Sequence, residues 1–142
     1  MTSSRPRPPG LRKASPLHLW VILDQAVLRR VVGSHAVMAE QIDALITAAR
    51  QPTIDIQVLP WEAGAHAAGL GHFVLLRTAG ALGAVYVEML GGGHYMDTAK
   101  EVHRYSVAMD YLRTRAADIT ESLHLLKAAR EEHKRYDGQA HT

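Results

Sequence analysis

The chain contains no cysteine, which excludes disulfide bonds, thiolate zinc sites and a cysteine nucleophile. No apolar run approaches the roughly 20 residues that span a bilayer, and the first 16 residues lack the apolar segment of a secretory signal. No serine lies in a G-x-S-x-G sequence, so a Ser/His/Asp triad is not indicated. These absences favour a cytoplasmic protein without membrane contact.

The 142 residues that are present form one domain of ordinary size, with enough apolar residues for a sizeable core. The net charge is +2, and the basic residues gather at the two ends of the chain. Because the body between them is close to neutral, we expect no direct binding of nucleic acid. The sequence divides into a disordered Pro/Arg-rich arm (residues 1–16), a single domain (residues 17–135) and a disordered tail (residues 136–142).

Alternation of apolar and polar residues predicts four strands, at residues 17–24, 53–59, 72–78 and 84–90. Residues 26–32 permit two interpretations, a further strand or a helical turn. The glycine-rich residues 91–96 are interpreted as a flexible connection.

Three helices are predicted after Ser34, Asp97 and Thr120, whose side chains can cap a first turn. The first of them is expected to face inward with Val37, Met38, Gln41, Ile42, Leu45 and Ala49. Residues 131–135 are interpreted as the frayed, solvated end of the last helix. The order of elements predicts an α+β fold, a mixed and mostly antiparallel sheet of about five strands with three helices packed on it.

The loop at residues 64–72 combines glycines with His66 and His72, so backbone freedom and titratable side chains coincide there. A metal site from His66, His72 and Glu88 is geometrically feasible, but no ligand pair has helical metal-binding spacing, and we predict neither metal nor cofactor. The loop also matches no phosphate-binding pattern, because a strand follows it where a helix is required.

Polar side chains on the predicted strands suggest the floor of a site beside this loop. Asp55, Gln57, Tyr86 and Glu88 lie on the non-aliphatic faces of their strands and would share one surface if those strands were neighbours. Such a polar lining orients a small ligand. The predicted ligand-binding residues are Asp24, Arg29, Gln57, Trp61, His66, His72, Tyr86, Glu88 and His94.

Several segments resemble one known family: L-W-V-I-L-D-Q-A-V-L-R-R-V-V-G, M-A-E-Q-I-D-A-L-I, I-Q-V-L-P-W-E-A-G-A-H, G-H-F and V-Y-V-E. Over about residues 17–130 the chain is similar to the actinobacterial domain of unknown function 5753 (DUF5753). The positions that match the family pattern are Asp24, Leu28, Arg29, Gly33, Met38, Gln41, Gln57, Leu59, Pro60, Gly64, His66, Phe73, Tyr86 and Glu88.

The resemblance implies the sensing or partner-binding half of an Xre-type helix-turn-helix regulator. This sequence has no helix-turn-helix, so we expect a fragment or a free-standing version that does not bind DNA itself. Two functions follow. The first is a module that binds a small molecule or a small partner protein. Whether this module is a monomer or a homodimer is an alternative that the sequence leaves open. The second is a small cyclase- or isomerase-type enzyme of specialised metabolism, with His66 as general acid or base beside Glu88.

Overall fold

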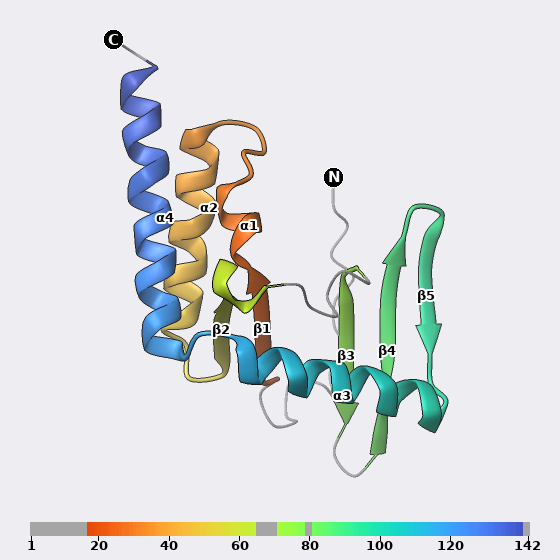
Figure 1. The fold of residues 1–142 in the computed structure, drawn as a ribbon. Coiled ribbons are helices and arrows are strands. Elements are labelled where there is room, and N and C mark those ends of the chain that lie inside the picture. The colour runs from red at the N-terminus through yellow and green to blue at the C-terminus, as the bar shows by residue number, and fades with distance from the viewer. Residues whose placement is uncertain (1–16, 65–70, 79–80, 141–142) are drawn as a thin grey trace, which may run out of the picture.

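The computed structural model describes residues 17–64, 71–78 and 81–140. Its strands form two small sheets (Figure 1). One is a parallel pair of β1 (Leu19–Asp24) and β2 (Ile54–Leu59). The other is an antiparallel sheet in the order β3 (Phe73–Thr78), β4 (Ala81–Met89) and β5 (Gly92–Met96). The α+β class and the five strands are confirmed, but the strands divide between two sheets.

The parallel pair belongs to a strand–helix–strand unit, because parallel neighbours require a long crossover connection. That connection contains α1 (Gln25–Arg29) and α2 (His35–Ala49), so the helical interpretation of residues 26–32 is the correct one. Asp24 caps α1 by accepting from the N–H of Ala26, and Ser34 caps α2 as predicted by accepting from the N–H of Val37.

The main core lies between the parallel pair and two helices, α2 and α4 (Ile119–Gln139), which run side by side in Figure 1. Its buried residues are Leu28, Ile42, Ile46, Ile56, Val58, Leu126 and Ala129. Two residues predicted to face inward on α2 do not: Val37 is 51% exposed and Gln41 is exposed. Ile46 is buried instead, because the buried stripe follows Met38, Ile42 and Ile46.

The last helix is longer and more buried at its end than predicted. Asp118, not Thr120, caps α4, and the helix continues to Gln139. The interpretation of residues 131–135 as a frayed, solvated end is wrong, because His133 is only 4% exposed. The charged sequence around His133 conceals that it continues the stripe of Leu126 and Ala129.

Helix α3 (Ala99–Arg115) connects the two sheets, since it contacts β2 as well as β3 and β4 (Figure 1). Thr98, the residue after the predicted Asp97, caps it. The ring of Tyr105 lies 5.1 Å from that of Phe73, and Val85 and Val102 are buried. None of the helices in the described ranges is long and apolar enough to cross a membrane.

The corner between α3 and α4 occupies the outer edge of β2. The N–H of Ala117 donates to the carbonyl of Val58 at 2.9 Å, and the N–H of Val58 donates to Oγ of Ser122 at 2.9 Å. The Ser122 hydroxyl in turn donates to the carbonyl of Ala117 at 3.1 Å. These bonds satisfy backbone groups that an open strand edge would leave unpaired.

Residues 92–96 form strand β5, so their prediction as a flexible connection is wrong. β5 pairs with β4, and Tyr86 lies opposite Tyr95 while Glu88 lies opposite Gly93. The far end of the Tyr86 ring occupies the position that a side chain at residue 93 would take. Gly93 is therefore a packing requirement of a strand rather than a sign of a loop.

Gly93→Ala is expected to lower the free energy of unfolding by about 1 kcal/mol, because the Tyr86 ring must shift to admit a methyl group. Urea denaturation measures the difference. Gly91→Ala is the matched control, since no atom lies within 4 Å of a side chain built there. Equal stability of both variants and the wild type would contradict this packing.

Candidate functional site

The residues predicted to floor a pocket lie on two different sheets. Gln57 is on β2, whereas Tyr86 and Glu88 are on β4, and these strands are not neighbours. The shared surface expected from adjacent strands therefore does not form. His66 lies outside the described residues.

Gln57 is buried and uses both ends of its amide within the protein. Its Oε1 accepts from Nε1 of Trp20 at 2.6 Å, and its Nε2 donates to the carbonyl of Ala117 at 2.9 Å. The guanidinium of Arg113 lies 4.0 Å from the centre of the Trp20 ring. In this arrangement Gln57 connects β1 to the α3–α4 corner, and a ligand would have to break these bonds to reach it.

The other predicted residues of the antiparallel sheet are dispersed. His72 directly precedes β3 and is exposed, as is Glu88 on β4. Tyr86 is half-buried, with its ring 6.5 Å from that of Tyr95. His94 lies next to Tyr95 along β5, and neighbouring residues of a strand face opposite sides of a sheet. His94 and Tyr86 are thus on opposite faces.

Trp61 and Arg29 lie nearer to the parallel pair. Trp61 begins a short 3-10 turn, η2 (Trp61–Ala63), directly after Pro60, and its backbone N–H donates to Oε1 of Gln25 at 3.0 Å. Its ring is exposed. The Arg29 guanidinium is paired with Glu132 of α4 at 2.8 Å, so it fastens α1 to α4.

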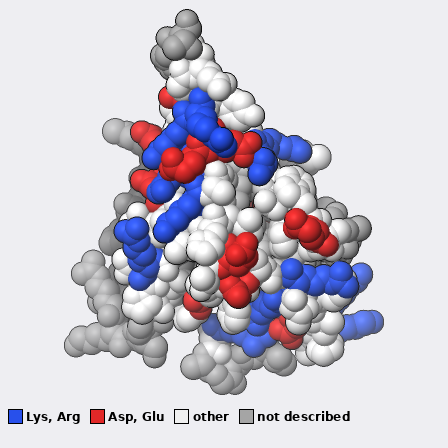
Figure 2. Space-filling view, turned by 60° about the vertical axis from the view of Figure 1, so that its left-hand side comes forward, with Lys and Arg blue, Asp and Glu red and all other residues white. Residues whose placement is uncertain are grey.

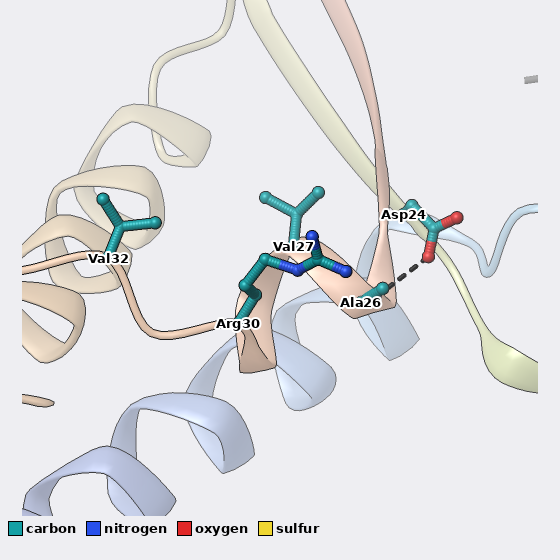
Figure 3. Close-up of a pocket in the computed structure, with 5 residues that line it drawn as sticks. All are labelled: Asp24, Ala26, Val27, Arg30 and Val32. Atoms are coloured by element: carbon teal, nitrogen blue, oxygen red, sulfur yellow. Dashed lines mark hydrogen bonds between the residues drawn. The ribbon is translucent and has the colours of Figure 1, made fainter. Parts of the chain in front are cut away.

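A hollow of about 300 Å³ lies at the carboxyl end of β1, the end at which parallel strands commonly present ligand sites. Its lining residues are Asp24, Ala26, Val27, Arg30 and Val32. In Figure 3, Val27 extends from α1 and Arg30 from the residue directly after it, and Val32 lies across from them on the segment that leads to α2. We call this feature the Arg30 hollow.

The Arg30 hollow offers one positive charge beside an aliphatic wall. Within the described residues the Arg30 side chain makes no hydrogen bond or ion pair, unlike that of its neighbour Arg29. Val27 and Val32 are 56% and 68% exposed. Asp24 is engaged, since it caps α1 at 2.9 Å and has a further contact. The arrangement suits a group of negative charge attached to an apolar body.

Comparison with protein families matches residues 4–128 to the model of a domain of unknown function, DUF5753. The chain belongs to the DUF5753 family. No curated protein and no solved structure matches it. The match begins within the segment predicted as an arm and ends inside α4, so it includes every residue of the Arg30 hollow.

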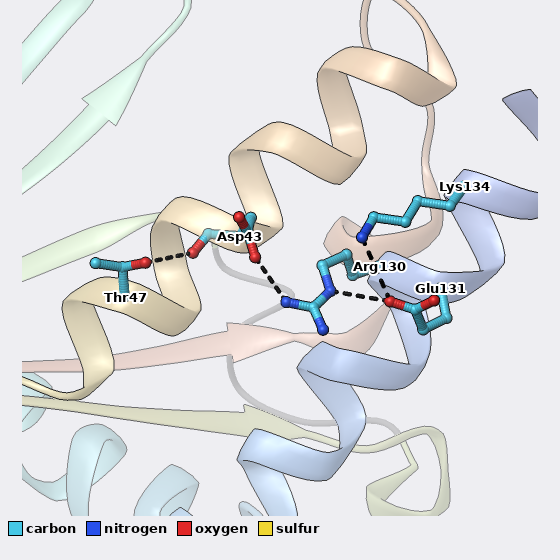
Figure 4. A network of polar contacts seen from close by, with 5 residues as sticks. All are labelled: Asp43, Thr47, Arg130, Glu131 and Lys134. Atoms are coloured by element: carbon cyan, nitrogen blue, oxygen red, sulfur yellow. Dashed lines mark hydrogen bonds and ion pairs between the residues drawn. The ribbon is translucent and has the colours of Figure 1, made fainter.

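A charged network joins α2 and α4 of the DUF5753 domain (Figure 4). Arg130 donates to Asp43 at 2.6 Å and to Glu131 at 3.2 Å, and Lys134 lies 3.6 Å from Glu131. The hydrogen bond to Asp43 is the largest effect on Arg130 and raises its pKa above the ordinary value. Figure 2 shows acidic and basic side chains gathered together in its upper part. Two basic residues of the C-terminal end are therefore already paired with acids.

The described part of the DUF5753 domain contains no group of three or more His, Asp or Glu side chains that could hold a metal ion. Of the predicted ligand-binding residues that the structure describes, which exclude His66, only Asp24 lines the Arg30 hollow. The sequence analysis missed Arg30, Val27 and Val32. The available signal was the Arg29–Arg30 pair at the end of α1, of which the structure pairs Arg29 with Glu132 of α4.

Proposed function

We propose that this DUF5753 domain binds a small anionic molecule with an apolar body in the Arg30 hollow. We further propose that it acts as a sensing domain related to the effector half of Xre-type regulators. The observation that carries the proposal is Arg30, a guanidinium with no partner among the described residues, set beside exposed valines at the end of a parallel strand pair.

The chemistry of the hollow narrows the ligand class. A guanidinium recognises a carboxylate with two parallel hydrogen bonds, which gives both affinity and orientation. Val27, which lies beside Arg30, and Val32, which lies across from it, provide apolar contact area. The volume of about 300 Å³ is at the lower limit for small-molecule sites. Short branched-chain carboxylic acids meet these requirements.

A ligand held there would contact both α1 and the segment before α2, and α1 is attached to α4 through Arg29 and Glu132. Occupancy would therefore favour one arrangement of these helices, which is how a sensing domain responds. The enzymatic alternative depends on His66 with Glu88. Glu88 is exposed on the other sheet from the hollow, so the binding role is the one we advance.

A two-dimensional NMR titration with 3-methylbutanoate tests the proposal, with the corresponding amide as a neutral ligand of the same shape. We expect the acid to shift the backbone amide signals of Val27, Arg30 and Val32, and the amide to shift them far less. Acid shifts confined to other parts of the molecule, or equal effects of acid and amide, would count against the Arg30 hollow.

Arg30→Gln is expected to weaken binding of the acid by about tenfold or more, because a charge-assisted hydrogen bond is lost. The same titration gives the dissociation constant. Arg104→Gln removes an equal charge from an exposed position on α3 and should bind the acid as the wild type does. If both variants lose affinity equally, the effect is one of net charge and not of contact with Arg30.

A further inference from the structure

Three segments meet at one buried side chain, His133 of α4. Its Nε2 lies 2.7 Å from the carbonyl oxygen of Leu28 in α1, and its Nδ1 lies 2.9 Å from Nδ1 of His35, the first residue of α2. The residues between these contacts include Arg30 and Val32 of the Arg30 hollow. One imidazole therefore holds both ends of the segment 28–35, which forms part of the hollow.

These contacts determine which ring nitrogens carry hydrogen. A carbonyl oxygen only accepts, so Nε2 of His133 donates to Leu28. A neutral His133 then has its lone pair on Nδ1, and Nδ1 of His35 must donate to it. When both rings are neutral, Nε2 of His35 is the remaining basic nitrogen of this histidine pair.

The pair can take up one proton with its contacts intact, but not two. The first proton goes to Nε2 of His35 and makes the shared hydrogen bond charge-assisted. A second would go to Nδ1 of His133, and its hydrogen would then point at the hydrogen of His35 across 2.9 Å. Two like charges would also face each other, so the rings must separate.

The sign of the pH effect follows from counting protons. A solvated imidazole takes up a proton as the pH falls through about 6.5, and unfolding leaves both imidazoles solvated. The native state with the pair intact holds at most one. Because the native state then binds fewer protons than the unfolded state, the stability of the closed arrangement falls as the pH falls.

The groups around the pair do not remove this conflict. From α4, Tyr136 stacks on His35 at 5.2 Å between ring centres, and Asp137 follows His133 by one turn and has a contact of its own. The nearest ion pair joins Arg29 of α1 to Glu132 of α4. The N-terminal end of α2 directs its backbone N–H groups toward this region, which disfavours added positive charge. A carboxylate near the pair would favour uptake of the first proton. In the doubly protonated pair, however, the two Nδ1 hydrogens would still collide.

We propose that the His35–His133 pair is a pH-sensitive control on the Arg30 hollow. Double protonation separates the rings, frees residues 28–35 from α4 and removes the ordered wall that carries Arg30 and Val32. The effect on ligand binding rests on the function proposed above, whereas the release of the segment does not.

Hydrogen exchange of the backbone amides of residues 28–35 tests the release. Protection factors remove the intrinsic effect of pH on exchange. We expect protection in the wild type to fall about fivefold or more from pH 7.5 to pH 5.5. His133→Gln retains a donor for Leu28 and does not titrate, and His35→Gln changes only a half-buried position. Both should show nearly equal protection at the two pH values.

His124→Gln is the matched control, because His124 is exposed on the same helix and should leave the wild-type response unchanged. Equal protection of the wild type at both pH values would overturn the proposal. The proposal would also be overturned if protection in His133→Gln and His35→Gln fell with pH as much as it does in the wild type.

The titration with 3-methylbutanoate, repeated at pH 5.5 on the wild type and on His35→Gln, tests the control of binding. Weaker binding to the wild type than to His35→Gln supports the proposal, and equal binding overturns the control of the hollow. Because the wild type and His35→Gln are compared at the same pH, protonation of the acid itself affects both measurements equally. If neither protein binds the acid at either pH, the proposed function fails, while the exchange measurement still decides the release.

Discussion

Leu28→Ala is expected to lower the free energy of unfolding by about 2–5 kcal/mol. Leu28 is 2% exposed and packs in the core with Ile42, Ile46 and Leu126, so truncation removes apolar burial and leaves a cavity. Its carbonyl is also the acceptor for His133. Loss of the side chain should therefore loosen α1, which Arg30 directly follows, as well as destabilise the whole domain.

Urea denaturation followed by tryptophan fluorescence measures this change, since Trp20 is hydrogen-bonded in the folded protein. Leu28→Met conserves volume and should cost less than about 1.5 kcal/mol. Val27→Ala, at the exposed neighbouring position, should stay within about 0.5 kcal/mol of the wild type. The placement of Leu28 in the core would be wrong if its alanine variant were no less stable than that of Val27.

Ser122→Ala should lower the free energy of unfolding by about 1–3 kcal/mol although it removes a single oxygen atom. Ser122 is fully buried, and its Oγ accepts from the N–H of Val58. Alanine leaves that N–H without its partner at a position that water does not reach. The carbonyl of Ala117 retains the bond from Gln57, so most of the cost comes from Val58.

Ser106→Ala is the matched control, because Ser106 lies within α3 and its hydroxyl has no side-chain bond among the described residues. It should change stability by less than about 0.5 kcal/mol. Hydrogen exchange at the amide of Val58 gives a local measurement, and that amide should exchange faster in Ser122→Ala. Equal stability of the two serine variants would mean that the α3–α4 corner does not close the edge of β2.

The local pattern of the sequence was sufficient to predict most of the helices and strands. Alternation predicted β1 and β2, and Ser34 predicted the start of α2, because these signals depend on neighbours in the chain. The signal failed at β5, where Gly93 is required by the Tyr86 ring of another strand. It failed also for His133, whose burial depends on the packing of α1 and α2 against α4.

The site was harder to predict than the fold, for a related reason. Gln57 has the chemistry of a ligand-binding residue, but strand pairing places it opposite Ile22 and within reach of Trp20, which uses its oxygen. Asp24 was identified as a position that matches the family pattern. Arg30 was not, because only the pairing of Arg29 with Glu132 reveals which of the two arginines remains open. Such information lies in contacts between distant segments, which sequence patterns do not contain.

The length of helix α4 determines where this domain can be shortened. The family match ends at residue 128, which is within α4 and before Ala129, Arg130 and His133. A polypeptide trimmed at that boundary would lack a core residue, the ion pair with Asp43 and the imidazole that anchors α1. The physical unit of this chain extends several helical turns beyond the recognised family segment, so a shortened version of it should keep those turns.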